Sequence, residues 1–361
     1  MYVHALAGGG AERVWAILAT EFCKFGHEVV VAVDYEAREN MAHLSPDARL
    51  VVLGGGHLRS TARLAGLIRR ERPDVTISAL ASSNLKHTVA AVLAGRLRRS
   101  VITYHGYTAN ERGLLSRIGY LATPLLTRMA ARTIAVSDGL ARYLQERLAA
   151  NPSRLSRIYN PVLSDRVAEK APNRTVPVIL SVGRLDHAKD HQTLLRAFAK
   201  VRQPSARLVI LGEGVEYARL EAEIDRLGLS GRVELRGYVM EPWPAFAEAS
   251  CLVLSSRVEA FGLAVVEALA HGMPVVATDC DGPREILLDP ALGVIVPVGD
   301  ATKMAEAIEA VLEDPGDAER RRRRAADFSP RRAATAYDAL FEAVVERDSS
   351  LRPSLFGRHG T

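Results

Sequence analysis

Short apolar runs alternate with amphipathic stretches along almost the whole chain. In the first half, the runs predict strands at 28–33, 75–80, 100–104 and 132–136, with helices at 11–25, 84–94, 113–130 and 139–149. In the second half, strands are predicted at 177–182, 207–211, 233–236, 251–254, 274–277 and 293–296, with helices at 190–201, 215–227, 243–249, 262–271 and 300–313. Strands that alternate with helices are typical of parallel sheets covered on both faces, and two such sets are present.

A polar stretch at 164–177, which contains Pro172 and Pro177, separates the two sets. The length of 361 residues also favours two domains over one. We therefore predict an α/β fold of two Rossmann-like, doubly wound domains with a cleft between them. The predicted domains are 1–165 and 170–329; a helix at 330–347 is expected to pack back on the first domain, and the tail at 348–361 to be disordered.

Composition and charge narrow the class of protein. The chain is 48% hydrophobic and 25% charged, as in ordinary globular proteins, and no apolar run approaches the roughly 18 residues of a membrane span. The first residues resemble no signal peptide, and three scattered cysteines favour reduced core thiols of a cytoplasmic protein. The net charge of +5 fits either a solvated surface or a basic face that meets anionic lipid or substrate.

The segment from Ser255 to Glu267 carries the most specific signal. It follows a predicted buried strand and enters a predicted helix, so Glu259 lies in the connecting loop and Glu267 inside the helix. Their backbones lie about 12 Å apart at most, given a rise of ~1.5 Å per helical residue. Between them, the free N–H groups of the helix N-terminus favour an anion. The order of carboxylate, anion site and carboxylate is complementary to a ligand made of a sugar, a diphosphate and a ribose.

A second candidate site follows the predicted strand at 177–182. There Arg184 and Lys189 flank a loop that begins with Gly183, and two cations at the carboxyl end of a parallel strand can neutralise a diphosphate. Two surface cations are the simpler interpretation of these residues alone. The Glu259 and Glu267 segment favours the phosphate role.

The first half offers weaker signals. Gly8, Gly9 and Gly10 open a predicted helix, but the spacing lacks the dinucleotide fingerprint and only Asp34 could contact a ribose, which disfavours a nicotinamide dehydrogenase. His105 ends a predicted strand and either faces the cleft or bonds to nearby backbone. The acidic residues of Asp279-Cys280-Asp281 lack a second group of oxygen ligands, so no metal is expected.

Together these motifs resemble the large family of retaining glycosyltransferases with the two-domain GT-B fold, including sucrose synthase-like, mannosyltransferase and lipopolysaccharide-core enzymes. The resemblance covers nearly the whole chain. Its elements are Gly8 to Val14, Ala135 to Ser137, Tyr159 to Pro161, Gly183-Arg184 with Lys189, Leu211 to Gly214, Glu259 to Glu267, Ala270 to Thr278 and Gly282 to Glu285. Two departures are the short segment Met1 to Leu6 before the glycine loop and Ala260 in place of a common glycine.

The resemblance implies that the second domain binds a nucleotide-diphosphate sugar and the first binds the acceptor. It implies that Arg184 and Lys189 hold the diphosphate in place of a metal, that Glu267 binds the ribose, and that Glu259 contacts the sugar. The implied catalytic residues are Arg184, Lys189, Glu259 and His105. The implied donor contacts are Gly9, Gly10, Gly183, Arg184, Lys189, Tyr238, Val239, Glu259, Phe261, Gly262, Leu263 and Glu267.

The expected activity is metal-independent, retaining transfer of a hexose-type sugar, without a cofactor, to a glycan or lipid-linked glycan. Acceptor contacts are expected on the loops Ser82 to Lys86 and Tyr107 to Leu115, with a peripheral contact at the inner membrane face and no nucleic-acid partner. A non-hydrolysing nucleotide-sugar epimerase on the same fold and an inactive nucleotide-sugar-binding subunit are the alternatives.

Overall fold

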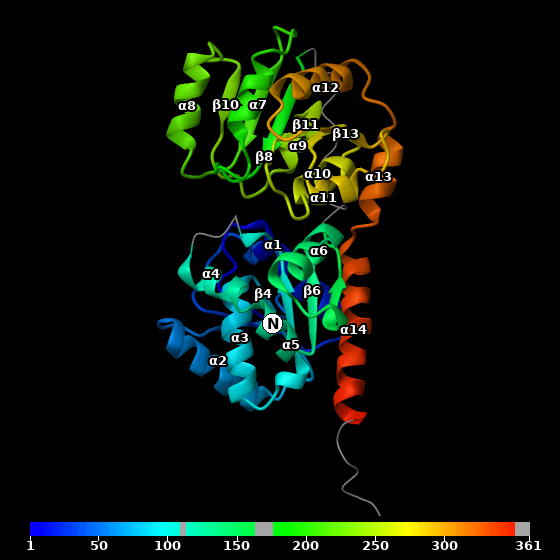
Figure 1. Ribbon diagram of the computed structural model, residues 1–361. Helices are drawn as coiled ribbons and strands as arrows, with labels where there is room; N and C mark the ends of the chain where they lie inside the picture. Colours follow the sequence, from blue (N-terminus) through cyan, green and yellow to red (C-terminus); the bar gives the residue numbers. More distant parts are fainter. Residues whose placement is uncertain (109–112, 163–175, 351–361) are drawn as a thin grey trace, which may run out of the picture. The chain divides into compact units, whose positions relative to one another are not determined.

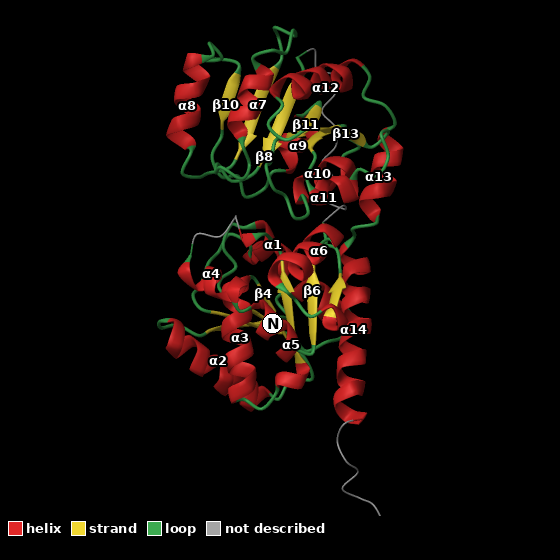
Figure 2. Ribbon diagram, viewed as in Figure 1, coloured by secondary structure: helices red, strands yellow, loops and turns green. Residues whose placement is uncertain are grey.

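The computed structural model describes residues 1–108, 113–162 and 176–350. The chain divides into two compact units, each built on its own sheet (Figure 1 and Figure 2). Of the described residues, the first unit comprises 1–136, 141–158 and 331–350, and the second comprises 137–140 and 159–330. The division thus falls at Ile158 and Tyr159, whereas the predicted boundary near residue 165 lies outside the described residues.

The first unit contains a seven-stranded parallel sheet of order β3-β2-β1-β4-β5-β6-β7. Its strands are β1 (Tyr2–Val3), β2 (Val30–Val33), β3 (Arg49–Val52), β4 (Thr76–Ala79), β5 (Ser100–Tyr104), β6 (Arg132–Ala135) and β7 (Leu155–Arg157). The central strands β4 and β5 are buried throughout, and their polar residues Thr76, Ser78, Ser100 and Thr103 are buried together with the apolar ones. β1 is short and lies between β2 and β4.

Helices connect these strands. They are α1 (Gly10–Lys24), α2 (His57–Glu71), α3 (Ala81–Leu93), α4 (Leu114–Leu121), α5 (Thr123–Met129) and α6 (Asp138–Leu148). The single helix predicted at 113–130 is wrong: the chain forms two helices, because Pro124 cannot continue an upstream hydrogen-bond ladder and instead occupies the first turn of α5. Helix α3 begins at Ala81, before the predicted start at 84.

The last helix, α14 (Pro330–Ser350), packs on the first unit. Its Tyr337 and Phe341 make edge contacts with Phe22 of α1, at ring-centroid distances of 5.9 and 5.3 Å. Near its end, Asp348 accepts a hydrogen bond of 2.7 Å from Arg99. The helix therefore continues into the segment predicted to begin the disordered tail at residue 348, and the residues beyond 350 lie outside the described part of the chain.

The second unit contains a six-stranded parallel sheet of order β10-β9-β8-β11-β12-β13. Its strands are β8 (Val178–Val182), β9 (Arg207–Leu211), β10 (Val233–Leu235), β11 (Cys251–Leu254), β12 (Val275–Thr278) and β13 (Gly293–Val296). Its helices are α7 (His191–Phe198), α8 (Tyr217–Arg226), α9 (Trp243–Glu248), α10 (Leu263–Ala270), α11 (Asp281–Ile286), α12 (Ala301–Glu313) and α13 (Ala318–Ala326).

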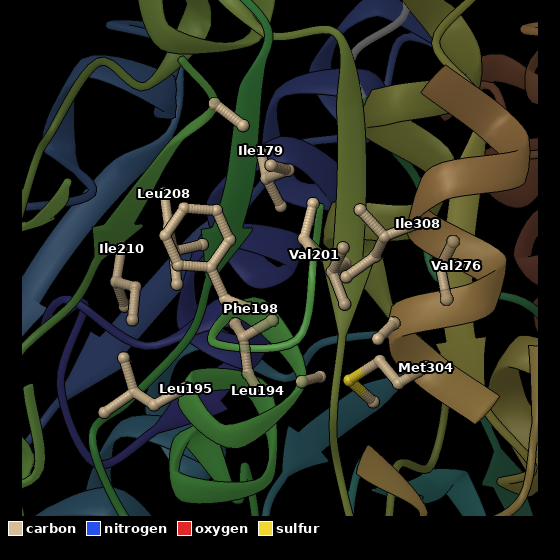
Figure 3. Packing of buried hydrophobic residues seen from close by; sticks show 14 of the residues in the cluster. Ile179, Leu194, Leu195, Phe198, Val201, Leu208, Ile210, Val276, Met304 and Ile308 are labelled. Carbon is tan, nitrogen blue, oxygen red and sulfur yellow. The ribbon is translucent and has the colours of Figure 1, made fainter. Parts of the chain in front are cut away.

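One face of this sheet packs against α7, α8 and α12 in a single hydrophobic core (Figure 3). Ile179 and Leu208 from the strands meet Phe198 of α7 and Ile308 of α12 in this cluster. Successive strand residues point to opposite faces, so Leu252 and its equivalents face the other side, where α10 packs against β11 and β12. Both faces of the central strands are thus covered, and the carboxyl ends of the strands are held rigidly.

Each sheet reverses its strand order at one place. In the first sheet this switch lies between β1 and β4, and in the second between β8 and β11. Loops that leave adjacent strands at such a point diverge and leave room for a ligand beyond the carboxyl ends. None of the helices in the described part of the chain combines the length and apolar character needed to cross a bilayer.

Candidate active site

The switch point of the second sheet brings two predicted motifs together. The loop after β8 contains Gly183, Arg184 and Lys189, and the loop after β11 contains Glu259. Because β8 and β11 are hydrogen-bonded neighbours, both loops leave the same edge of the sheet side by side. The structure therefore assembles residues that lie 70 positions apart in the chain.

The loop after β8 is shaped by two aspartates. Asp186 accepts hydrogen bonds from the backbone N–H groups of Ala188 and Lys189, at 3.1 and 3.2 Å, which closes a tight turn. Asp190 then caps α7, accepting from the backbone N–H of Thr193 at 3.3 Å and from its hydroxyl at 2.8 Å. These contacts fix the backbone on both sides of Lys189, so that its side chain leaves the loop in a defined direction.

Three further contacts hold the two loops together. The Ser255 hydroxyl donates to the carbonyl of Lys189 at 2.8 Å, and the Arg257 N–H donates to the carbonyl of Ala188 at the same distance. The Arg257 guanidinium also pairs with Asp190, which is buried, at 2.9 Å. The separation of the loops is thus set by hydrogen bonds that do not involve the candidate catalytic side chains.

Lys189 and Glu259 form an ion pair across this junction. Their side chains are only 22% and 14% exposed, so the pair is less screened by water than a surface salt bridge. The Lys189 stem lies against Gly183, where a Cβ would approach its Cε to 3.2 Å. Glycine at position 183 therefore leaves the space through which the ammonium reaches Glu259.

Arg184 is the more exposed cation of the site. Its guanidinium pairs with Asp186 at 3.1 Å and its side chain is 63% exposed. It shares the short β8 loop with Lys189, whose direction is fixed by the same Asp186. An exposed guanidinium beside a positioned ammonium can bind a phosphate that also contacts the lysine.

Helix α10 follows the β11 loop and carries the second glutamate. Gly262 caps the helix with φ of 99°, a backbone conformation that favours glycine. Phe261 is buried, Leu263 is the first helical residue, and Glu267 lies within the helix at 2% exposure. A glutamate buried this deeply needs polar partners, and its position inside the helix makes its carboxylate a rigid hydrogen-bond acceptor.

Two neighbouring titratable groups remain neutral near physiological pH. Burial and the positive charge of Lys189 lower the pKa of His191 to about 4. Burial raises the pKa of the Cys280 thiol to about 11, and Glu259 adds to this shift. His191 therefore adds no positive charge beside Lys189, and Cys280 supplies no thiolate.

The remaining donor-site predictions lie on the edge formed by β8, β9 and β10. Gly212 donates its N–H to the carbonyl of Gly237 at 2.7 Å, and a Cβ on Gly212 would lie 1.9 Å from the carbonyl oxygen of Gly183. Tyr238 follows as a 41% exposed side chain, next to the partly buried Val239. The close approach at Gly212 therefore places the start of the 237–239 segment next to the loop that bears Lys189.

The predicted residues of the first half belong to the first unit. Gly9 caps α1, and the Asn40 side chain holds the loop through the carbonyl of Ala7. The His105 ring contacts the Thr103 hydroxyl at 2.9 Å and lies edge-on to Trp15. At the switch point of this sheet, Leu80 has φ of 75°, an uncommon conformation for leucine that often accompanies a functional loop.

Two further expectations concern the acidic motif and the acceptor loops. Asp279 pairs with Arg284 at 2.6 Å, and the described residues contain no group of three or more side chains suited to a metal. The prediction of an acceptor loop at Ser82 to Lys86 is wrong, because this segment forms the first turns of α3 and Lys86 is buried against Asp34. The middle of the loop predicted at Tyr107 to Leu115 lies outside the described residues.

The structure thus groups Gly183, Lys189, Glu259 and Gly262 around one junction, with Glu267 in the helix behind it. It places Gly9, Gly10 and His105 in the other unit. Sequence reasoning missed the positioning residues Asp186, Asp190 and Arg257. An aspartate three residues before Lys189 and another at a helix start are recognisable turn and cap signals, but the partner of Arg257 is apparent only in three dimensions.

Comparison with known proteins agrees with this architecture. Residues 8–166 match the family described as Glycosyltransferase Family 4, and residues 165–328 match the family described as Glycosyl transferases group 1. The chain belongs to the group 1 glycosyltransferases with the GT-B fold. The predicted family and fold class are therefore confirmed.

Two relatives of this glycosyltransferase align over most of both chains. The N-acetylgalactosamine-N,N'-diacetylbacillosaminyl-diphospho-undecaprenol 4-alpha-N-acetylgalactosaminyltransferase of Campylobacter jejuni is 28% identical, with 87% of this chain and 90% of the relative covered. The lipopolysaccharide core biosynthesis glycosyltransferase LpsE of Rhizobium meliloti is also 28% identical, with 87% and 88% covered.

Two solved structures share the fold of this glycosyltransferase. Sucrose-phosphate synthase from Thermosynechococcus elongatus superposes with a TM-score of 0.80 at 20% identity, covering 94% of each chain. Anabaena HepE in complex with UDP and glucose gives a TM-score of 0.77 at 20% identity, covering 97% of this chain and 98% of that one.

Proposed function

We propose that this glycosyltransferase transfers a hexose-type sugar from a nucleotide-diphosphate donor to a glycan or lipid-linked glycan, with retention of the anomeric configuration and without a metal. The observation that carries this proposal is the Lys189–Glu259 pair at the switch point of the second sheet. It puts a positioned cation and a carboxylate at the edge where open parallel sheets bind ligands. Cell-surface polysaccharide or glycolipid synthesis is the proposed setting.

The donor would lie along this edge of the second unit. Lys189 and Arg184 provide positive charge for the diphosphate, and the N–H groups at the start of α10 provide further donors. Glu267 accepts hydrogen bonds from the ribose hydroxyls, and Glu259 contacts the sugar beside the ammonium. The nucleobase lies against the backbone of Gly237, Tyr238 and Val239. In the first unit, His105 approaches the transferred sugar, and Gly9 and Gly10 approach the phosphates.

The reaction requires only positioning and charge stabilisation from these residues. The acceptor hydroxyl oxygen attacks the anomeric carbon on the face from which the phosphate leaves, while the bond between that carbon and the phosphate oxygen breaks. The acceptor proton passes to a phosphate oxygen of the leaving nucleotide. Lys189 and Arg184 stabilise the negative charge that develops on this group, so no enzymic nucleophile takes part.

The names of relatives support the substrate classes. The Campylobacter jejuni enzyme is named for transfer to a diphospho-undecaprenol-linked sugar, and HepE was solved with UDP and glucose. A UDP-sugar is therefore the first donor to test, and a polyprenyl-diphosphate sugar the first acceptor.

The activity test separates the proposal from its rivals. Nucleotide-diphosphate sugars are first screened in EDTA for the shift they cause in melting temperature, and the best binder is then incubated with and without acceptor. We expect donor consumption that depends on the acceptor, and NMR of the product should show the same anomeric configuration as the donor. Conversion of the sugar without acceptor would identify an epimerase, and binding without turnover would identify an inactive subunit.

A surface of the first unit supports a peripheral membrane contact. Helices α4 and α5 expose an apolar stripe, in which Leu114 is 74%, Leu121 80% and Leu125 60% exposed. Arg117 and Arg128 are exposed on the same two helices. Large apolar side chains flanked by arginines are typical of helices that lie in the headgroup region of anionic bilayers.

We predict that the double substitution Leu121→Gln and Leu125→Gln weakens binding to vesicles that contain phosphatidylglycerol by roughly tenfold or more, because each buried leucine is worth about 1.5–3 kcal/mol. Co-sedimentation measures this. Leu58→Gln is the matched control, since Leu58 is 90% exposed on α2. Equal loss in both variants, or no vesicle binding by the unaltered protein, would contradict the membrane contact.

A further inference from the structure

A cavity of about 370 Å³ lies at the amino-terminal edge of the first sheet, opposite the edge that carries His105. Its lining comes from the start of β6, from the 3₁₀ helices Leu97–Arg99 and Pro152–Arg154 that precede β5 and β7, and from the last turns of α5 and α14. Because β5, β6 and β7 are parallel neighbours, their amino-terminal ends meet at one edge. The fold therefore brings segments that are distant in the chain to a cavity within the size range of small-ligand sites.

Each of these segments contributes an arginine to the cavity. The five are Arg98, Arg128, Arg132, Arg154 and Arg347. Among the described residues of the lining, Asp348 is the one acid, and it already accepts a hydrogen bond of 2.7 Å from a sixth arginine, Arg99. Five guanidiniums thus share a small cavity with little negative charge.

Backbone carbonyls position two of the guanidiniums. Arg154 donates from Nη1 to the carbonyl of Ala130 at 2.6 Å and to that of Met129 at 3.3 Å, both at the end of α5. Arg132 donates from Nη1 to the carbonyl of Ala131 at 3.3 Å. A carbonyl orients a guanidinium without cancelling its charge, and a guanidinium has five N–H donors, so each retains donors for a ligand.

The like charges at the cavity act on one another. Burial, followed by the charges of Arg347 and Arg132, lowers the pKa of Arg154. The protein therefore keeps three guanidiniums together at an electrostatic cost. An anion bound among them would replace this repulsion with attraction.

Helix ends explain only part of the cluster. Arg128 and Arg347 stand in the last turns of α5 and α14, where a cation complements the helix dipole. Arg98, Arg132 and Arg154 stand at or just before the starts of strands, where no such effect applies. The convergence of all five arginines on one cavity remains to be explained by a ligand.

The chemistry of the lining indicates phosphate. The planar fork of a guanidinium matches two oxygens of a phosphate group. One phosphate group carries at most about two negative charges, so two or more adjacent groups are needed to balance the five arginines. A neighbouring hollow of about 360 Å³ shares Arg98 with the cavity and adds Arg96, which extends the basic lining.

We propose that this cavity, which we call the arginine pocket, binds a ligand that carries at least two adjacent phosphate groups. A soluble diphosphate or triphosphate and the headgroup of a lipid with two phosphates share this chemistry. The arginine pocket lies at the other edge of the sheet from His105, and the proposal does not rest on the proposed function.

Calorimetric titration of the full chain with inorganic triphosphate at low, fixed salt tests the proposal. We expect Arg132→Gln with Arg347→Gln to weaken binding at least about tenfold, because two charged partners are lost. Arg132→Lys with Arg347→Lys keeps the charge and should recover part of the affinity. Triphosphate should raise the melting temperature of the unaltered protein more than that of the Gln variant.

Two controls separate the arginine pocket from other basic residues. Arg322→Gln with Arg323→Gln removes the same charge from exposed positions of α13 and should leave the affinity unchanged. Lys189→Ala should also retain the binding, which excludes the candidate active site as its location. Equal affinity in the pocket Gln variant and the unaltered protein, an equal loss in the α13 variant, or loss of binding in Lys189→Ala alone would overturn the proposal.

Co-sedimentation with cardiolipin vesicles, compared with phosphatidylcholine vesicles, distinguishes the two sources of phosphate. Binding to cardiolipin that the pocket Gln variant loses and that triphosphate displaces would identify a lipid headgroup. Loss of triphosphate binding with unchanged vesicle binding would identify a soluble ligand. If the unaltered protein bound neither triphosphate nor cardiolipin, the arginine pocket would not be a phosphate site.

Discussion

Lys189→Ala is expected to lower the rate of sugar transfer by about 10²–10³-fold, the usual effect of removing one positioned group that stabilises developing charge. Its ammonium forms an ion pair with Glu259, and the Asp186 turn orients it from the β8 loop. The expected change in melting temperature is small, because Lys189 lies at the loop edge of the sheet and contributes nothing to the core. Initial rates with saturating donor measure the effect.

Lys303→Ala provides the matched control. Lys303 also pairs with a glutamate, Glu306 at 2.8 Å, but on the exposed face of α12. This variant should retain the rate of the unaltered protein. If Lys189→Ala turned over at a comparable rate, Lys189 could not be the group that stabilises the leaving nucleotide.

Lys86→Ala is expected to reduce the free energy of unfolding by about 3–5 kcal/mol, the usual cost of leaving one member of a buried ion pair alone. Lys86 and Asp34 are 5% and 6% exposed, with 2.6 Å between Nζ and Oδ2. His4 and the Tyr2 hydroxyl also donate to this carboxylate, but neither supplies a permanent charge. Urea unfolding, followed by a signal that comes from the first unit alone, measures the loss of unfolding free energy.

The pH dependence of stability gives an independent check. Burial alone would raise the pKa of Asp34, but hydrogen bonds from His4 and Lys86 outweigh it and lower the pKa to about 2. Because the pKa of Asp34 is lower in the folded protein than its unfolded value of 3.8, the ionised carboxylate stabilises the fold above pH 3.8. This stabilisation is lost as the pH falls from 3.8 toward 2. Asp34→Asn should remove this part of the acid transition.

A double variant, Lys86→Met with Asp34→Leu, separates charge from packing. Because no charge is then left buried, it should lose less stability than Lys86→Ala. An equal or larger loss would show that the methylene stem of Lys86, which also passes over the Tyr2 ring, carries the effect instead of the ion pair.

The buried parallel strands were the most predictable part of the fold. Val178–Val182 and Cys251–Leu254 are covered on both faces, so each is a mostly apolar run between polar loops, interrupted only by Ser181 in the first. β3 was not predicted, because Arg49–Val52 forms the edge of its sheet and is partly exposed. α2 follows three glycines and is rich in arginine, which obscured its narrow apolar stripe, Leu64 to Ile68.

The candidate site was predictable to the extent that its motifs are local. Glu259, Glu267 and Lys189 stand in short segments next to recognisable strands, so their position at a sheet edge followed from the α/β pattern. The contacts that orient them join Lys189 to Ser255 and Asp190 to Arg257, across 66 and 67 positions (255 − 189 and 257 − 190). The ion pair of Lys86 could not be predicted for the same reason, since its partner Asp34 is 52 positions away in the chain.

The most direct test of the central claim is a structure of this protein with a nucleotide-diphosphate sugar bound. We predict that the diphosphate contacts Lys189 and Arg184, that the ribose hydroxyls donate to Glu267, and that the sugar lies beside Glu259. A donor bound away from the carboxyl ends of β8 and β11, or a diphosphate that reaches neither cation, would contradict the account.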